Sequence, residues 1–126
     1  MTTIFPVLRY RDPHAAIDFL QRAFGFERHA VHEDDSGTVQ HAELRRDDAI
    51  LMLGGVREDT EYGKVAQPPG SGAVYIATDD IDALHDRAKA AGAEILMGPL
   101  DTDYGSRDFT ARDPEGNVWS FGTYAP

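Results

Sequence analysis

The chain contains no cysteine, no long apolar run and few basic residues. The absence of cysteine excludes a disulfide framework, a thiolate metal site and a thiol nucleophile. No apolar stretch approaches the roughly 20 residues that cross a bilayer, and the N-terminal segment MTTIFPVLRY lacks the basic start and apolar core of a signal peptide. We therefore expect a cytoplasmic protein that does not insert into a membrane.

Acidic residues outnumber basic ones, with 22 Asp and Glu against 12 Lys and Arg and a formal net charge of −10. Such a surface repels phosphate backbones, so nucleic acid is excluded as a partner. A length of 126 residues with 41% hydrophobic residues suits one domain with a core of its own, so we expect residues 1–126 to form a single domain.

The segment from Asp103 to Tyr124 has the pattern of a β-hairpin. Ser106–Arg112 contains neither Gly nor Pro, and Asn117–Tyr124 is rich in aromatic and β-branched residues, as strands are. The residues between them, DPEGN, have turn chemistry, because Pro114 presets the first corner and Gly116 can adopt positive φ.

The two halves of the chain repeat one pattern at an offset of 67 residues, which pairs Asp12 with Asp79 and Gly25 with Gly92. In each half a strand precedes a helix that begins at an Asp and ends at a Gly, and further strands follow. Each copy therefore reads βαβββ. The predicted strands are Ile4–Tyr10, Phe26–Glu33, Thr38–Arg46, Ala49–Leu53, Ala73–Thr78, one from Glu94, and the two of the hairpin.

Between the repeats, Gly54–Gly72 is polar and rich in Gly and Pro, which predicts a linker without regular structure. Module one is expected at about residues 1–55, the linker at about 56–71 and module two at about 72–126.

The order of Tyr104-Gly105, a strand with Phe109, and Asp113-Pro114-Glu115-Gly116-Asn117 resembles the C-terminal signature of the vicinal oxygen chelate superfamily. This superfamily comprises glyoxalases, bleomycin-resistance proteins and dioxygenases, and the match is to the bleomycin-resistance-like branch. The resemblance implies an α+β fold in which two βαβββ modules form a curled mixed sheet around a cleft, with the helices outside. It also implies a homodimer.

Metal-dependent members of this superfamily place His, Gln or Glu on the first and last strands of each module. The matching positions here hold Phe5, Met52, Ala73 and Ser120, none of which is a competent ligand. We therefore expect no metal, no other cofactor and no catalytic residue. His41 and Glu43, two residues apart on one predicted strand, remain the alternative starting point for a metal site with non-standard ligands.

Period-two alternation along the predicted strands identifies the residues that would line a cavity. Trp119 is interpreted as core in preference to ligand contact, and Tyr104 and Arg107 either polarise a ligand oxygen or lie on the hairpin surface. The candidate ligand-binding residues are Phe5, Val7, Arg9, His41, Ile50, Met52, Tyr75, Tyr104, Arg107, Trp119, Ser120 and Tyr124.

Such a lining is mostly apolar and aromatic, which suits a small aromatic or amphipathic molecule held by stacking and burial. The hypothesis is metal-free binding and sequestration of such a molecule, for example an antibiotic, as in drug-resistance binding proteins. One alternative is a metal-dependent lyase, isomerase or dioxygenase of the same superfamily. A third is an accessory or sensing domain.

Overall fold

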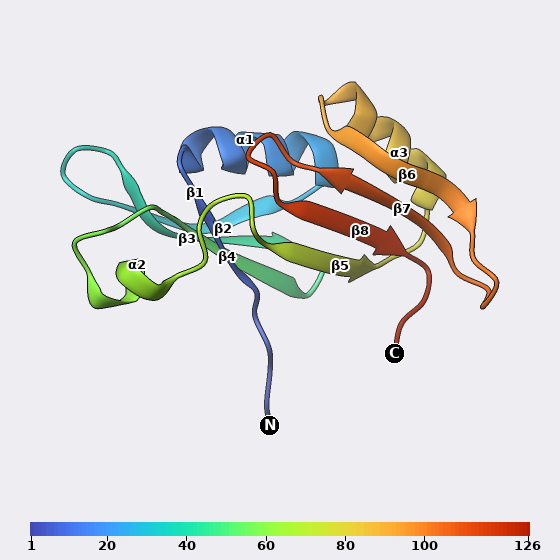
Figure 1. The fold of residues 1–126 in the computed structure, drawn as a ribbon, viewed down its shortest axis with the longest axis horizontal. Coiled ribbons are helices and arrows are strands. Elements are labelled where there is room, and N and C mark those ends of the chain that lie inside the picture. The colour runs from blue at the N-terminus through green and yellow to red at the C-terminus, as the bar shows by residue number, and fades with distance from the viewer.

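The computed structural model describes residues 1–126 as two four-stranded sheets and three helices (Figure 1). The first unit comprises β1 (Val7–Tyr10), α1 (Pro13–Phe24), β2 (Glu27–Glu33), β3 (Val39–Arg46) and β4 (Ala49–Gly55). The second comprises β5 (Ala73–Ala77), α3 (Ile81–Ala90), β6 (Glu94–Asp101), β7 (Arg107–Arg112) and β8 (Val118–Gly122). The predicted α+β class and the two βαβββ modules are confirmed.

The two sheets share one topology. Their strand orders are β1-β4-β3-β2 and β5-β8-β7-β6. β1 runs parallel to β4 and β5 runs parallel to β8, and all other neighbouring strands are antiparallel. The sheets are not closed into a barrel.

The ends of α1 lie where the sequence predicts them. Asp12 occupies the N-cap position and accepts a hydrogen bond from the Ala15 amide at 3.1 Å, with Pro13 in the first turn. Gly25 ends the helix in the left-handed conformation, with φ of 80°. None of the three helices combines the length and apolar character needed to span a membrane.

Alternation along the strands sends one set of side chains into a single core beneath α1 and α3. This core contains 22 buried hydrophobic residues from both modules. Phe24 of α1 packs against Trp119 and Phe121 of β8, with ring centroids 5.2 and 4.8 Å apart. The residues in between face the opposite side of the sheets.

Polar contacts also join the modules. The Tyr10 hydroxyl donates to Asp113 at 2.6 Å, and the Glu115 carboxylate accepts from the amides of Arg11 and Asp12 at 2.6 and 2.9 Å. The DPEGN turn therefore anchors the end of β1 in addition to reversing the chain.

Several predicted boundaries are corrected by the structure. The segment predicted as a linker contains a short helix, α2 (Glu61–Val65), because the Thr60 hydroxyl caps it by accepting from the Gly63 amide at 2.9 Å. Gly54 and Gly55, predicted as loop, extend β4, since Arg9 and Tyr10 of β1 pair with them. The first strand begins at Val7, after Pro6, and the last ends at Gly122, which leaves Tyr124 outside it.

Candidate ligand-binding face

We call the side of the two sheets opposite α1 and α3 the open face, because only the short helix α2 lies on that side, near one end of the first sheet (Figure 1). Large apolar side chains stand exposed there, including Val7 of β1 at 42% and Tyr75 of β5 at 43%. The residues that alternate onto this face are Val7, Arg9, His41, Glu43, Ile50 and Met52 in the first sheet and Ala73, Tyr75, Ala77, Thr110 and Ser120 in the second.

One pocket on this side lies at the seam between the sheets and has a volume of about 310 Å³. It brings together Phe5, Ile50, Tyr75 and the buried Trp119. These four are all candidates from the sequence, and they come from both modules. Most of the other lining residues are also hydrophobic, and Arg46, Asp47 and Asp48 form a charged part of the wall, so the seam pocket suits a hydrophobic ring system that carries some polar groups.

A second pocket, also of about 310 Å³, lies at the other end of β1 and brings together Val7, Arg9 and His41. We call it the Arg9 pocket. Its remaining wall includes Arg57, Thr60 and Tyr62 from the segment between the modules. Met52 lies between the two pockets, since it pairs with Val7 in the sheet and follows Ile50 by two positions on the same face.

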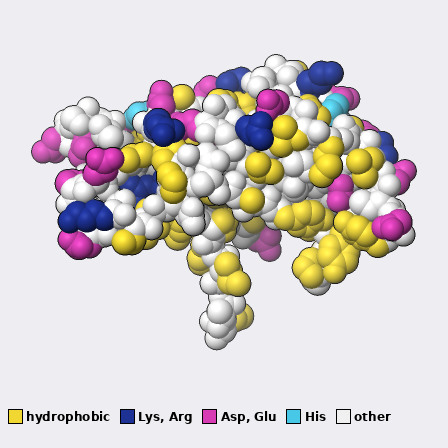
Figure 2. Space-filling model, in the orientation of Figure 1, with side chains coloured by type: hydrophobic (Ala, Val, Ile, Leu, Met, Phe, Trp, Pro, Cys, Tyr) yellow, Lys and Arg dark blue, Asp and Glu magenta, His cyan; other side chains and the backbone are white.

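Three tyrosines of the second module, Tyr75, Tyr104 and Tyr124, lie together just beyond the end of β8. The Tyr75 hydroxyl donates to the Tyr124 carbonyl at 2.7 Å, and the rings of Tyr104 and Tyr124 meet edge to face at 5.9 Å. Loss of water around Tyr75 raises the pKa of its hydroxyl. Elsewhere on this sheet, the hydroxyl groups of Ser120 and Thr110 form a hydrogen bond of 3.0 Å. In Figure 2 the two projections that carry the chain termini are partly hydrophobic.

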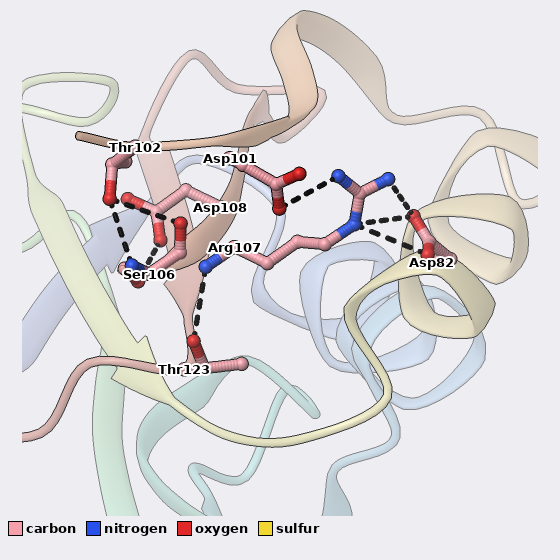
Figure 3. A network of polar contacts seen from close by, with 7 residues as sticks. All are labelled: Asp82, Asp101, Thr102, Ser106, Arg107, Asp108 and Thr123. Carbon is pink, nitrogen blue, oxygen red and sulfur yellow. Dashed lines mark hydrogen bonds and ion pairs between the residues drawn. The ribbon is translucent and has the colours of Figure 1, made fainter. Parts of the chain in front are cut away.

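Arg107 is separated from the other candidates. Its guanidinium lies between Asp82 of α3 and Asp101, with hydrogen bonds of 2.9 and 3.1 Å (Figure 3). These bonds raise the pKa of Arg107 and direct its side chain toward the helix layer. The structure therefore does not bring Arg107 together with Tyr75 and Ser120.

Trp119 is fully buried, and its indole N–H donates to Asp113 at 3.0 Å. It belongs to the core, as interpreted from the sequence, although one part of it also borders the seam pocket.

Histidines gather at the β2–β3 edge of the open face. The Glu43 carboxylate lies 3.0 Å from His41 Nε2 and 3.9 Å from His29 Nε2, and the rings of His32 and His41 stack at 6.0 Å. The hydrogen bond from His41 lowers the pKa of Glu43. No group of three or more His, Asp or Glu residues in the structure is placed to hold a metal ion. The donor set consequently does not fit a metal here.

Sequence reasoning missed the part of the site that the inter-module segment supplies. Tyr62 lies over Arg9, with its ring centroid 5.6 Å from the guanidinium carbon. The Gly- and Pro-rich composition concealed the cap at Thr60, which is the one local signal that indicates order there.

The chain matches the family model described as "Glyoxalase/Bleomycin resistance protein/Dioxygenase superfamily" over residues 4–121. TioX from Micromonospora sp. ML1 has a similar structure, with a TM-score of 0.82 and 31% identity over 99% of this chain and 100% of that one. TnmS3, an antibiotic binding protein from Streptomyces sp. CB03234, gives a TM-score of 0.76 and 25% identity over 96% and 94% of the two chains.

The anthracycline biosynthesis protein DnrV of Streptomyces peucetius is 31% identical over 117 residues, which is 86% of this chain but only 42% of that protein. The family match spans nearly the whole chain and agrees with its paired βαβββ units. The chain therefore belongs to the glyoxalase/bleomycin resistance protein/dioxygenase superfamily.

Proposed function

We propose that this protein binds and sequesters a small aromatic or amphipathic molecule, of the kind to which antibiotics belong, on its open face and without a metal. The observation that carries the proposal is the chemistry of that face. Its central residues, Val7 and Met52, are apolar, and two pockets flank them. Stacking and area burial are the interactions that such a lining supplies.

The residues at the expected metal-ligand positions also support binding without a metal. Phe5, Met52, Ala73 and Ser120 offer no imidazole or carboxylate. A lyase, isomerase or dioxygenase of this superfamily would need a concentrated positive charge at the reacting oxygen, which these side chains do not provide. The antibiotic-binding description of TnmS3 supports a binding role at the level of the family.

We further propose that the protein acts in the cytoplasm as a homodimer whose second copy covers part of the open face. The chain exposes 7463 Å², whereas a monomer of 13.9 kDa is expected to expose roughly 6,700 Å². The projecting chain ends contribute to this excess (Figure 1), and the exposed apolar side chains of the open face offer surface that a second copy can bury. Light scattering should therefore give about twice 13.9 kDa, and a monomer mass at all concentrations would refute the dimer.

The test of the binding face is Met52→Arg, which puts a charge in the middle of the apolar surface. Titration with the fluorescent neutral aromatic N-phenyl-1-naphthylamine should show saturable binding to the wild type and none to the variant. Val65→Arg is the matched control, because Val65 is 80% exposed on α2 and lines neither pocket. Unchanged affinity in Met52→Arg would show that the site lies elsewhere, while chelator-sensitive turnover of any substrate would favour an enzyme.

A further inference from the structure

We infer that the ligand carries an acidic oxygen group, such as a carboxylate or sulfonate, which the Arg9 pocket receives while the aromatic body lies over Val7 and Met52. This inference rests on the proposed function and specifies the class of molecule. It starts from Arg9, a half-buried arginine for which the structure contains no ion pair, although the chain has 22 acidic residues.

The Nε atom of Arg9 is buried without a hydrogen-bond partner. A buried donor left unpaired costs about 1–3 kcal/mol, so such an atom calls for an acceptor that the chain itself does not supply. A guanidinium presents a planar fork of donors that matches a carboxylate or a similar anion in two parallel hydrogen bonds.

The Arg9 pocket itself contains no acidic residue and leaves space beside Arg9, while Glu58, which lines a neighbouring hollow with Arg9, forms no ion pair with it. Gly54, the residue paired with Arg9 in the sheet, has no side chain to cover the guanidinium. Apolar Val7 and Leu53 form part of the wall, which strengthens a charge interaction by lowering the local polarity.

The other charged or titratable residues that line the Arg9 pocket, Arg57 and His41, are already paired. Arg57 is bonded to Asp59 at 3.2 Å through both Nε and Nη2, and His41 is bonded to Glu43 at 3.0 Å. The Tyr62 ring lies against Arg9 on one side and leaves its charge uncompensated. Arg9 is thus the free cationic group of this pocket.

The spacing of residues along β1 allows one ligand to place its anionic group at Arg9 and its aromatic body over Val7. Residues two apart on a strand lie about 7 Å from each other on one face, so Arg9 and Val7 are separated by roughly the length of a fused two-ring system. A net charge of −10 repels free anions at long range. Small inorganic anions should therefore bind poorly, and an acid with an apolar body should bind well because burial adds to the charge contact.

Two fluorescent probes that differ only by the acidic group test this inference. They are 8-anilinonaphthalene-1-sulfonate and its neutral counterpart N-phenyl-1-naphthylamine. The wild type should bind the sulfonate more tightly than the neutral probe. Arg9→Gln should weaken sulfonate binding about ten-fold or more, as loss of a charged hydrogen bond does, and should change binding of the neutral probe less than about two-fold. Arg9→Lys should restore part of the difference.

Arg28→Gln is the control, because Arg28 is exposed on β2 and lines neither pocket. This substitution changes the net charge of the protein by the same amount as Arg9→Gln. Equal affinity of the wild type for both probes, or an equal loss of both in Arg9→Gln, would overturn the inference alone. An equal loss of sulfonate binding in Arg28→Gln would also overturn it, by attributing the effect to net charge. If neither probe bound the wild type, the proposed function would fail, and the inference with it.

Discussion

At the scale of single residues, Asp113 and Tyr10 show how one carboxylate serves both modules. Asp113 is buried and accepts from the Tyr10 hydroxyl, the Trp119 indole and the amides of Glu115 and Asn117. Burial and, after it, the Asp113 charge raise the pKa of Tyr10 far above its usual value. Tyr10 therefore stays a neutral donor throughout the physiological range.

This shift predicts a loss of stability in alkali. Tyrosine titrates near pH 10 in an unfolded chain, so above about pH 10 the unfolded state releases a proton that the folded state keeps. The free energy of unfolding is then expected to fall as pH rises, by up to about 1.4 kcal/mol per pH unit, and to be unaffected by this group below that pH. Urea denaturation across the alkaline range measures the slope.

Tyr10→Phe should be less stable than the wild type at neutral pH by about 1.5–3 kcal/mol, because it removes a hydrogen bond to a charged group. Its stability should also fall less steeply in alkali. The same alkaline slope in both proteins would mean that other groups cause the decline.

Sequence reasoning identified Asp113 as a turn residue, which it is, but not its partnership with Tyr10. The two lie 103 positions apart, and no local pattern encodes that contact. The pairing of Arg107 with Asp82 was not predicted for the same reason, since Asp82 belongs to a different element. By contrast, alternation alone placed Tyr75 and Met52 on the open face, because side-chain direction is a local property of a strand.

At the scale of elements, the two repeats differ at the start of their helices. Asp12 caps α1 through its side chain, whereas Asp80, at the N-cap of α3, has φ of 51° and makes no capping bond. We expect Asp12→Ala to lower the free energy of unfolding by about 1 kcal/mol. Asp80→Gly should leave stability unchanged or raise it by up to about 1 kcal/mol, because glycine adopts this conformation without strain. Urea denaturation of both variants measures these free energies of unfolding. Equal decreases in Asp12→Ala and Asp80→Gly would contradict the difference between the two caps.

The inter-module segment was the least predictable element. Its composition indicates a loop, yet Thr60 caps α2 and Tyr62 packs over Arg9. Likewise, Gly54 and Gly55 look like a break in the sequence but continue β4, because the neighbouring β1 supplies their partners. A Cβ at Gly54 would lie 2.6 Å from the Gln40 carbonyl oxygen, which explains glycine within a strand.

At the scale of the molecule, the repeat predicts two similar modules but not how they pack. In the structure they share one core, and Trp119 of the second module lies 5.2 Å from Phe24 and 5.9 Å from Phe26 of the first, between ring centroids. Neither module therefore buries its aromatic residues alone.

This shared core predicts that the modules unfold together. Trp119 is the chain's one tryptophan, so its fluorescence reports the boundary between the modules, while far-ultraviolet circular dichroism reports both sheets. The two signals should follow a single coincident transition in urea. Phe24→Ala should move both midpoints together, with a loss of about 3–5 kcal/mol, because it opens a cavity beside Trp119. A fluorescence change that precedes the loss of secondary structure would instead mean that the modules separate before either unfolds, and that contacts such as Tyr10–Asp113 contribute little to holding them together.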